Sequence, residues 1–375
     1  MINRAIKHQL AEAMNPGRVV LLFGARRTGK TMLLQTISDE LPDGKILRVN
    51  GENLDTAEIL SSRRLSILET FVKGIEYLFI DEAQAIPDIG ANLKLLIDSY
   101  PGLSIFATGS SAFDLRNKTG EPLVGRGKTF NLFPFSTGEL SEDFLSFKTG
   151  LPARLIYGSY PEVVTANNEV EMIEQLGSIR DGYLLKDILA LDNVKDSRFV
   201  LSLLRYLAYQ VGNDVSANEL AKNLGVNRLT VNRYLDLLEK SFVIFSIGAF
   251  SRNLRNEISR SSRYYFWDNG IRNSIISNYN SLTVRNDEGQ LWENYFVSER
   301  FKRSFYSRED TRFYFWRTYD QKEIDLIEEK SGELTAIEVK FTKQNVKCPA
   351  VFREAYPGAK FMVANRDNAF DLLTD

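Results

Sequence analysis

The feature that most constrains the fold is a glycine-rich segment close to the amino terminus. The apolar run RVVLLF at residues 18–23 has the composition of a buried parallel strand. GARRTGKT follows at once, from Gly24 to Thr31, and the helical pattern MLLQTISDEL comes next. A strand, a glycine-rich loop and a helix in this order place backbone N–H groups and a helix amino terminus around a phosphate. The segment therefore predicts a nucleotide-binding α/β domain with a parallel sheet.

The residues of this loop have distinct expected roles. Lys30 is expected to meet the β- and γ-phosphate oxygens as a catalytic residue, and Thr31 to ligate Mg²⁺. The other residues expected to line the nucleotide are Gly24, Ala25, Arg26, Arg27, Thr28, Gly29 and Met32. For Arg26 and Arg27, exposure to solvent is an equally good interpretation. ATP and Mg²⁺ are the cofactors that the loop implies.

A second apolar stretch, YLFI at residues 77–80, runs directly into Asp81 and Glu82. An ATPase needs such a pair at the end of a strand that neighbours the phosphate loop. Asp81 is expected to hold the magnesium shell, and Glu82 to orient and deprotonate the attacking water. A surface turn after the strand is the alternative interpretation.

A third apolar stretch, LSIFATG at residues 103–109, ends next to Ser110. A polar side chain at this position is expected to sense the γ-phosphate. Ser110 is our candidate for that contact, and Thr108 and Ser111 compete for the same role.

GARRTGKT, YLFIDEAQ, the strand that ends in TGSS, and the later GRGKTFNLFPFSTGEL together resemble AAA-type ATPases of the P-loop class. They are similar in particular to prokaryotic ATPases that carry a C-terminal domain of unknown function. The resemblance implies that Arg126, in VGRGKTF, contacts the γ-phosphate or acts as a catalytic arginine finger, in its own subunit or in a neighbouring one. A surface salt bridge is the alternative for this arginine.

A helix-turn-helix pattern begins at Ser216. Ser216 followed three residues later by Glu219 is a capping box, and Gly225 permits the tight turn before the second helix. The apolar FVIFSIGAF and the later YYFWD would supply the strands of a wing, which makes this region a winged-helix candidate. The residues expected in its core are Val226, Leu229, Tyr234, Leu235 and Leu238.

The second helix of this pattern is a candidate for DNA contact in the major groove. The residues expected to face DNA are Asn227, Arg228, Thr230, Asn232 and Arg233. Two arginines provide few positive charges for contact with DNA phosphates, and winged helices also serve as rigid packing modules. Both interpretations stay open.

Near the carboxyl terminus, EIDLIEEK and LTAIEVKFT alternate as two strands joined by a turn. Residues two apart share one face of a strand, so Glu338 and Lys340 are expected to project together, with Asp325 facing the same pocket. Glu293, on a preceding helix, could supply a third carboxylate. Two carboxylates and a lysine can bind a divalent cation and hold an activated water against a phosphodiester.

The Asp-x12-Glu-x-Lys spacing resembles the PD-(D/E)xK nuclease fold of restriction endonucleases and archaeal Holliday-junction resolvases, over residues 286–375. It implies metal ligation by Glu293, Asp325 and Glu338, and catalysis by Glu338 and Lys340. Ile324 stands where that family often has proline before the aspartate. A solvated hairpin face and a nuclease fold retained without cleavage are the alternatives.

Composition excludes several classes of protein. The single cysteine, Cys348, leaves no internal disulfide, and the single histidine, His8, disfavours a Ser-His-Asp hydrolase. The 47 basic and 49 acidic residues give a net charge of −2, although SRNLRNEISRSSR at residues 251–263 is locally basic. No apolar stretch approaches the ~20 residues that span a bilayer, and no secretory signal pattern is present, so we expect a cytoplasmic protein.

The 375 residues are expected to form three parts. Residues 1–140 would be the ATPase domain, 141–285 a helical lid and winged-helix module, and 286–375 a small restriction-endonuclease-like α/β domain. The leading hypothesis is an ATP-hydrolysing switch or motor coupled to a nucleic-acid-binding, nuclease-like domain. The alternative is a nucleotide-gated scaffold that binds DNA or a protein partner without cleavage, and a homo-oligomer is compatible with either.

Overall fold

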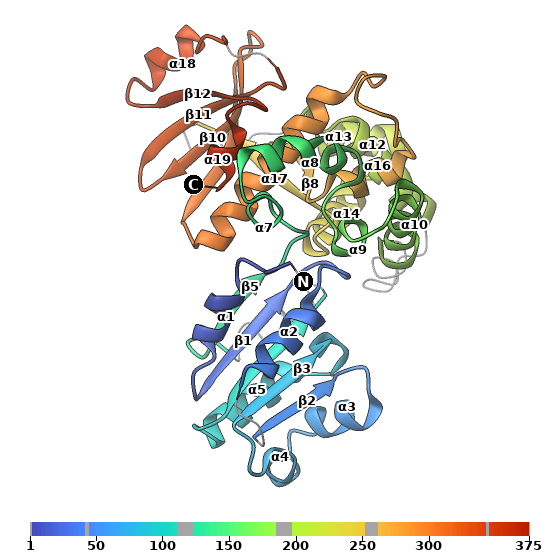
Figure 1. The fold of residues 1–375 in the computed structure, drawn as a ribbon, viewed down its shortest axis with the longest axis vertical. Helices are drawn as coiled ribbons and strands as arrows, with labels where there is room; N and C mark the ends of the chain where they lie inside the picture. The colour runs from blue at the N-terminus through green and yellow to red at the C-terminus, as the bar shows by residue number, and fades with distance from the viewer. Residues whose placement is uncertain are drawn as a thin grey trace. The chain divides into compact units, whose positions relative to one another are not determined.

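The computed structural model describes residues 2–41, 45–110, 123–184, 197–251, 262–342 and 345–374. They form two compact units, shown by the ribbon in Figure 1. The first unit comprises Met1–Phe133 and Lys240–Phe242, and the second comprises Pro134–Glu239 and Val243–Asp375. The chain therefore passes from one unit to the other three times.

The first unit is built on a five-stranded sheet in the order β2-β3-β4-β1-β5, in which every pair is parallel. Its strands are β1 (Arg18–Phe23), β2 (Ile46–Asn50), β3 (Tyr77–Asp81), β4 (Ser104–Gly109) and β5 (Gly127–Asn131). All of β4 and all of β1 after Arg18 are buried. Near-continuous apolar runs of this kind are typical of parallel strands covered on both faces. The predicted parallel α/β fold is confirmed.

Helices cover this sheet, and α2 packs against β3 and β4 while α1 and α5 pack against β1 (Figure 1). The helices of the first unit are α1 (Lys7–Ala13), α2 (Lys30–Asp39), α3 (Leu54–Ser61), α4 (Leu65–Val72), the 3-10 turn η1 (Ala83–Ala85) and α5 (Ile89–Ser99). Because β1, β3 and β4 are parallel, their carboxyl ends meet at one edge of the sheet. That edge carries the three segments predicted to bind nucleotide.

The second unit begins with a largely helical region. Its helices up to the helix-turn-helix pattern are α7 (Thr137–Leu140), α8 (Phe144–Tyr157), α9 (Pro161–Val164), α10 (Glu169–Ile179), the π-helical η2 (Arg180–Leu184) and α12 (Ser197–Tyr209). The later helices are α13 (Ala217–Leu224), α14 (Arg228–Lys240), α16 (Asn269–Ile276), α17 (Glu288–Ser307), α18 (Ala350–Ala355) and α19 (Ala369–Thr374). In the described part of the chain, no helix is both long and apolar enough to cross a membrane.

A seven-stranded mixed sheet, in the order β12-β11-β10-β9-β7-β8-β6, organises the second unit. Its strands are β6 (Asp214–Val215), β7 (Ile244–Ala249), β8 (Ser262–Phe266), β9 (Thr311–Arg317), β10 (Glu323–Lys330), β11 (Glu333–Val339) and β12 (Lys360–Ala364). β7 pairs with β9, so strands from both sides of residue 285 share this sheet. The three-part division stays a prediction, and its second boundary falls inside one compact unit.

The helix-turn-helix elements lie where the sequence pattern places them. The side chain of Ser216 accepts a hydrogen bond from Glu219 N at 3.1 Å, and Gly225 ends α13 with φ of 68°. Val231, Tyr234, Leu235 and Leu238 form the buried stripe of α14. The prediction that Leu229 belongs to this core is wrong: its side chain is 80% exposed, because it falls off the stripe in the first turn of α14.

Helix α17 fixes the segment that connects β5 to the second unit. The backbone N–H of Thr137 donates to Glu299 Oε2 at 2.6 Å, and the Thr137 hydroxyl lies 2.7 Å from Tyr295 OH. Lys302 Nζ donates to Glu299 Oε1 at 2.7 Å and to Phe135 O at 3.3 Å. Glu299 and Lys302 are buried, so this pair has low solvent screening and holds the segment firmly.

Candidate nucleotide site and carboxylate cluster

The phosphate loop follows β1 and bends sharply at two glycines. A Cβ atom at Gly24 would lie 2.2 Å from Leu132 O, so this position admits only glycine. Gly29 has φ of 95°, a left-handed conformation, and it caps α2 at the amino end. The loop residue Arg27 is exposed with φ of 61°, and Met32 is 51% exposed on the first turn of α2.

Lys30 points into the loop. Its ammonium group donates to Gly24 O at 2.9 Å and to Ala25 O at 2.8 Å, and the side chain is buried. Thr28 Oγ1 donates to Ala25 O at 2.8 Å, which fixes the same turn. A phosphate group would compete with these carbonyl oxygens for the ammonium, since its negative charge adds Coulomb attraction that a neutral carbonyl oxygen lacks.

Thr31 and Asp81 come together although 50 residues separate them. Thr31 Oγ1 donates to Asp81 Oδ2 at 2.8 Å, and Thr108 Oγ1 donates to Asp81 Oδ1. A hydroxyl and a carboxylate are the hard oxygen ligands that Mg²⁺ prefers alongside water and phosphate oxygens. The donor set at this edge of the sheet therefore fits Mg²⁺.

Glu82 and Ser110 are joined by Gln84, a residue that the sequence did not single out. Gln84 Nε2 donates to Glu82 Oε2 and, at 3.1 Å, to Ser110 Oγ. Ser110 N donates in turn to Gln84 Oε1 at 3.3 Å. Thr108 orients Asp81 and accepts from Glu82 N at 3.2 Å, which leaves Ser110 as the polar side chain at the strand end. Ser111 lies outside the described residues.

Arg126 is not brought to the phosphate loop of its own chain. It directly precedes β5, whose first residue, Gly127, is paired with Val19 at the amino end of β1. The phosphate loop follows the opposite end of β1. Arg126 Nε donates to Asp98 Oδ1 at 2.6 Å, and both side chains are partly exposed. The salt bridge that the sequence left as an alternative is therefore present.

Arg4 supports the phosphate loop and was missed by the sequence analysis. Its Nη1 atom donates to Thr28 O at 3.0 Å, and its Nη2 atom donates to Phe133 O at 2.6 Å. One guanidinium thus joins the loop to the residue that ends the first unit. The contacts span 24 and 129 residues, and no local pattern marks them.

The second unit brings Asp325, Glu338 and Lys340 together. Asp325 lies on β10 and Glu338 on β11, and Lys340 directly follows Val339 at the end of β11. Lys340 Nζ lies 2.9 Å from Asp325 Oδ2 and 2.8 Å from Glu338 Oε1. Val339 N also donates to Asp325 Oδ2, at 2.8 Å. Burial would lower the pKa of Lys340, but the two carboxylates raise it above its usual value.

Glu293 on α17 joins this group. Tyr265 OH donates to Glu293 Oε1 at 2.8 Å, and the backbone of Gly212 packs against the same carboxylate. Burial and the charge of Asp325 raise the pKa of Glu293 to about 8. Burial and, to a smaller extent, the charge of Asp325 also raise the pKa of Glu338. Glu293, Asp325, Glu338 and Lys340 therefore form one carboxylate cluster.

A further cation, Arg263 on β8, lies within this cluster. Its Nη1 atom is 3.8 Å from Asp325 Oδ1 and 4.0 Å from Glu293 Oε1. The sequence placed Arg263 in a basic stretch whose other arginines, Arg252, Arg255 and Arg260, lie outside the described residues. Among the residues that the structure describes, no group of three or more His, Cys, Asp or Glu side chains is arranged to hold a metal ion.

Three family models match successive parts of the chain. Residues 16–141 match the family described as AAA domain, residues 148–282 match Domain of unknown function (DUF8612), and residues 288–375 match Domain of unknown function (DUF4143). Together with the strand order and the phosphate loop, the first match makes the amino-terminal region an AAA-type P-loop ATPase domain that binds nucleotide. The DUF4143 domain follows at the carboxyl end.

Relatives cover most of the chain. An uncharacterized protein of Mycobacterium tuberculosis is 29% identical over 345 residues, which are 89% of this chain and 73% of the relative. An uncharacterized protein of Haemophilus influenzae is 27% identical over 89% of this chain and 85% of the relative. One of Methanocaldococcus jannaschii is 25% identical over 85% of this chain and 74% of the relative.

Solved structures show weaker similarity. A Signal Transduction ATPase with Numerous Domains (STAND) protein from Pyrococcus horikoshii is 12% identical with a TM-score of 0.29, over 82% of this chain and 48% of that chain. The Pif1 helicase from Candida albicans is 13% identical with a TM-score of 0.28, over 40% of this chain and 44% of that chain. The matches span less than half of either solved chain, and similarity at this level supports no functional conclusion.

We predict that Arg4→Ala weakens nucleotide binding by roughly 10- to 100-fold, because the carbonyl oxygens of Thr28 and Phe133 lose the charged donor that fixes the loop. Titration of the purified protein with a fluorescent ATP analogue measures the effect. Lys7→Ala is the matched control, since Lys7 carries the same charge nearby but pairs with Glu40 on the surface. Equal affinities of Arg4→Ala and Lys7→Ala would show that Arg4 does not support the loop.

Proposed function

We propose that the protein is an ATP-hydrolysing switch whose second unit binds nucleic acid. The observation that supports hydrolysis most directly is the contact of Thr31 with Asp81, at 2.8 Å, beside the buried ammonium of Lys30. Positioning and electrostatic stabilisation account for nearly all of phosphoryl-transfer catalysis. These three residues are placed to supply both.

Each residue has one task in this proposal. Lys30 leaves the carbonyl oxygens of the loop and binds the β- and γ-phosphates. Thr31 and Asp81 would hold Mg²⁺, which neutralises charge on the phosphates when it is bound. Glu82 orients the attacking water and accepts its proton, and Ser110 is placed to contact the γ-phosphate. Gln84 holds the Glu82 carboxylate toward Ser110, and its hydrogen bond must be released for Glu82 to receive the water.

Arg126 has a role in this proposal only in an assembly. It lies at the opposite end of β1 from the phosphate loop of its own chain. A finger role therefore requires a second copy of the chain that brings Arg126 to a neighbouring site.

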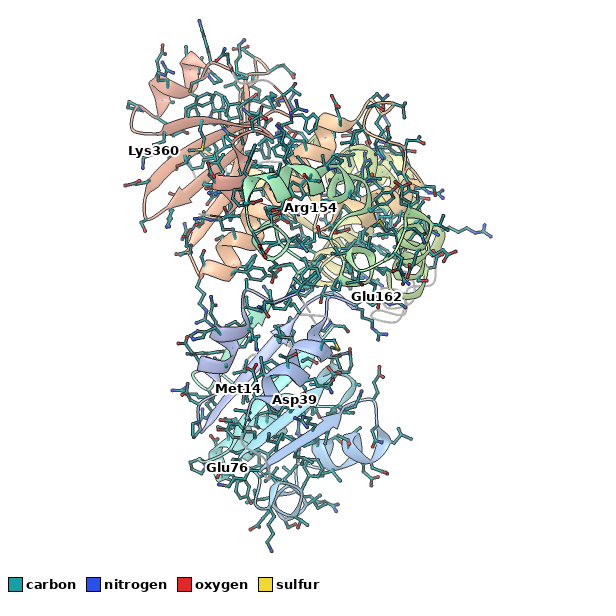
Figure 2. All side chains as sticks on the ribbon, in the orientation of Figure 1. Met14, Asp39, Glu76, Arg154, Glu162 and Lys360 are labelled. Atoms are coloured by element: carbon teal, nitrogen blue, oxygen red, sulfur yellow. The ribbon has the colours of Figure 1, made fainter. Side chains whose placement is uncertain are left out.

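ATP turnover with Mg²⁺ tests the hydrolysis proposal. We expect Lys30→Ala and Glu82→Gln each to lose roughly 100-fold or more of the turnover, by analogy with the loss of one preorganised catalytic group. Glu82→Gln should still bind ATP, whereas Lys30→Ala should bind it weakly. Glu76→Gln is the matched control. Glu76 immediately precedes the amino end of β3, whereas Glu82 follows the carboxyl end of the same strand (Figure 2).

The control should retain the turnover of the unaltered protein. If Lys30→Ala and Glu82→Gln hydrolyse ATP as fast as Glu76→Gln, the assignment of this site to hydrolysis is wrong.

The nucleic-acid part of the proposal rests on the surface of α14. Asn227, Arg228, Asn232 and Arg233 are exposed, Thr230 is half-buried, and β7 and β8 pair as antiparallel strands after the two helices. This arrangement is similar to a winged helix. The alternative is a module that only packs within the unit, and exposed Leu229 on the same surface would suit a protein partner.

We expect Arg228→Ala to weaken duplex DNA binding uniformly across sequences, and to reduce the slope of log affinity against log salt by about 1. Fluorescence anisotropy with two unrelated duplexes at several salt concentrations measures both quantities. Lys73→Ala, which removes an exposed charge from the first unit, should leave them unchanged. Identical curves for Arg228→Ala and Lys73→Ala would leave α14 without a role in DNA contact.

The carboxylate cluster does not favour phosphodiester cleavage. Its two carboxylates and lysine have the types and spacing of a nuclease site, but the guanidinium of Arg263 lies between Asp325 and Glu293. We therefore propose that the second unit binds nucleic acid through α14 and does not cleave phosphodiester bonds at this cluster.

A further inference from the structure

The side chain of Arg263 is surrounded by acidic groups from three elements. Its Nε atom donates to Asp214 Oδ1 at 3.0 Å, and its Nη2 atom donates to Glu323 Oε2 at 2.7 Å. Its Nη1 atom faces Asp325 and Glu293 at 3.8 and 4.0 Å. The side chain is only 3% exposed, so the charge is held within the protein.

Several contacts fix the guanidinium in this position. The backbone of Arg263 is paired with Ile247 on β7 and with Asp214 on β6. The guanidinium carbon lies 4.6 Å from the centre of the Phe315 ring, within the range of a cation–π interaction. Arg317 Nη1 binds the other oxygen of Asp214 at 2.8 Å, which fixes that partner as well.

The arrangement does not fit a divalent cation. Asp325 Oδ2 already accepts from Lys340 Nζ and Val339 N, so only Oδ1 remains toward Glu293, and it faces Arg263. Mg²⁺ requires oxygen ligands at about 2.0–2.1 Å in near-octahedral geometry. A planar guanidinium with five N–H donors takes up the space between these oxygens. A divalent ion added there would also be repelled by buried Arg263 and half-buried Lys340.

We propose that Arg263 is the resident cation of the carboxylate cluster, in the place where a nuclease site of this kind holds its metal. The guanidinium offsets the charge of Asp325 and faces Glu293, and its bonds to Asp214 and Glu323 keep it there. The cluster is thus a metal-independent element of the second unit. The conclusion that the cluster does not cleave nucleic acid rests on the proposed function. The assignment of Arg263 as the cation of the cluster does not.

Removal of the guanidinium should convert the cluster into a metal site. Arg263→Ala leaves the carboxylates of Asp214, Glu293, Glu323 and Asp325 around a space of guanidinium size. Carboxylate oxygens with excess negative charge bind divalent cations. Arg263→Lys keeps a positive charge in place and serves as the conservative variant.

Mn²⁺ binding, followed by electron paramagnetic resonance on the nucleotide-free full chain, tests the proposal. All variants carry Asp81→Asn, which removes the metal ligand of the ATPase site. We expect Arg263→Ala to bind Mn²⁺ at least about tenfold more tightly than the parent and the Arg263→Lys variant. The added Asp325→Asn change should abolish this gain. Mn²⁺ should also raise the melting temperature of Arg263→Ala and leave that of the parent unchanged.

Two results would overturn the proposal. One is Mn²⁺ binding by the parent that is lost on Glu293→Gln or Asp325→Asn, because the cluster would then hold a metal beside Arg263. The other is a folded Arg263→Ala variant with no gain in Mn²⁺ affinity. If Arg263→Ala does not fold, the Mn²⁺ binding of the parent is the deciding measurement. Mn²⁺ binding that depends on Glu293 or Asp325 refutes the proposal, and the absence of such binding supports it. ATP turnover of the unaltered protein is measured separately. A protein that does not hydrolyse ATP would contradict the proposed function but would not affect the Mn²⁺ test.

Discussion

Helix α17 is the element on which the second unit depends. Asn294 binds the backbone of β8, accepting from Phe266 N at 2.7 Å and donating to Phe266 O at 3.0 Å. Arg300 pairs with Glu328 of β10, with its Nη2 atom 2.5 Å from Glu328 Oε2. Glu293 belongs to the carboxylate cluster. A shift of α17 would therefore disturb two strands and the cluster together, since packed elements change between discrete arrangements.

The same helix holds the segment that leaves the ATPase domain. Glu299 binds Thr137 N and Lys302 binds Phe135 O, while Phe133 O, four residues before Thr137, accepts from Arg4. Arg4 also binds the carbonyl of Thr28 in the phosphate loop. Hydrogen bonds of Arg4 thus hold the phosphate loop to Phe133, and hydrogen bonds of α17 hold the segment that follows Phe133 along the chain.

A second contact involves Phe133. The ring of Phe133 packs edge-to-face against Phe242 at 6.1 Å, within the first unit. Phe242 lies two residues after the end of α14, the helix with the exposed arginine and asparagine side chains. Phe133 therefore contacts both Arg4 and Phe242 within the first unit.

The sequence predicted the residues that belong to contiguous patterns. The phosphate loop lies between a strand and a helix, and Asp81 and Glu82 directly end a strand, so local order was enough to place them. The two-residue period of a strand likewise placed Glu338 and Lys340 on one face. The parallel sheet followed from the strand–loop–helix order and from continuous apolar runs, whereas the order of the strands was not predicted and comes from the structure.

The residues that were missed act through contacts with distant parts of the chain. Arg4 binds residues 24 and 129 positions away, and its own surroundings in the sequence carry no motif. Arg263 appeared to be one of several basic residues in a polar stretch, and only the pairing of β8 with β6 and β7 places it among carboxylates. Leu229 was misassigned because an apolar residue in the first turn of a helix can fall outside its buried stripe.

Hydrogen–deuterium exchange with and without ATP tests the proposal that the protein is a switch, in which nucleotide at the phosphate loop changes the second unit at α17. Exchange reports local opening of hydrogen-bonded segments. The Glu82→Gln protein, saturated with ATP and Mg²⁺, should show altered exchange in the phosphate loop, in residues 134–140 and in α17. Lys30→Ala under the same conditions should show none of these changes. Altered exchange confined to the phosphate loop, with residues 134–140 and α17 unchanged, would contradict the account.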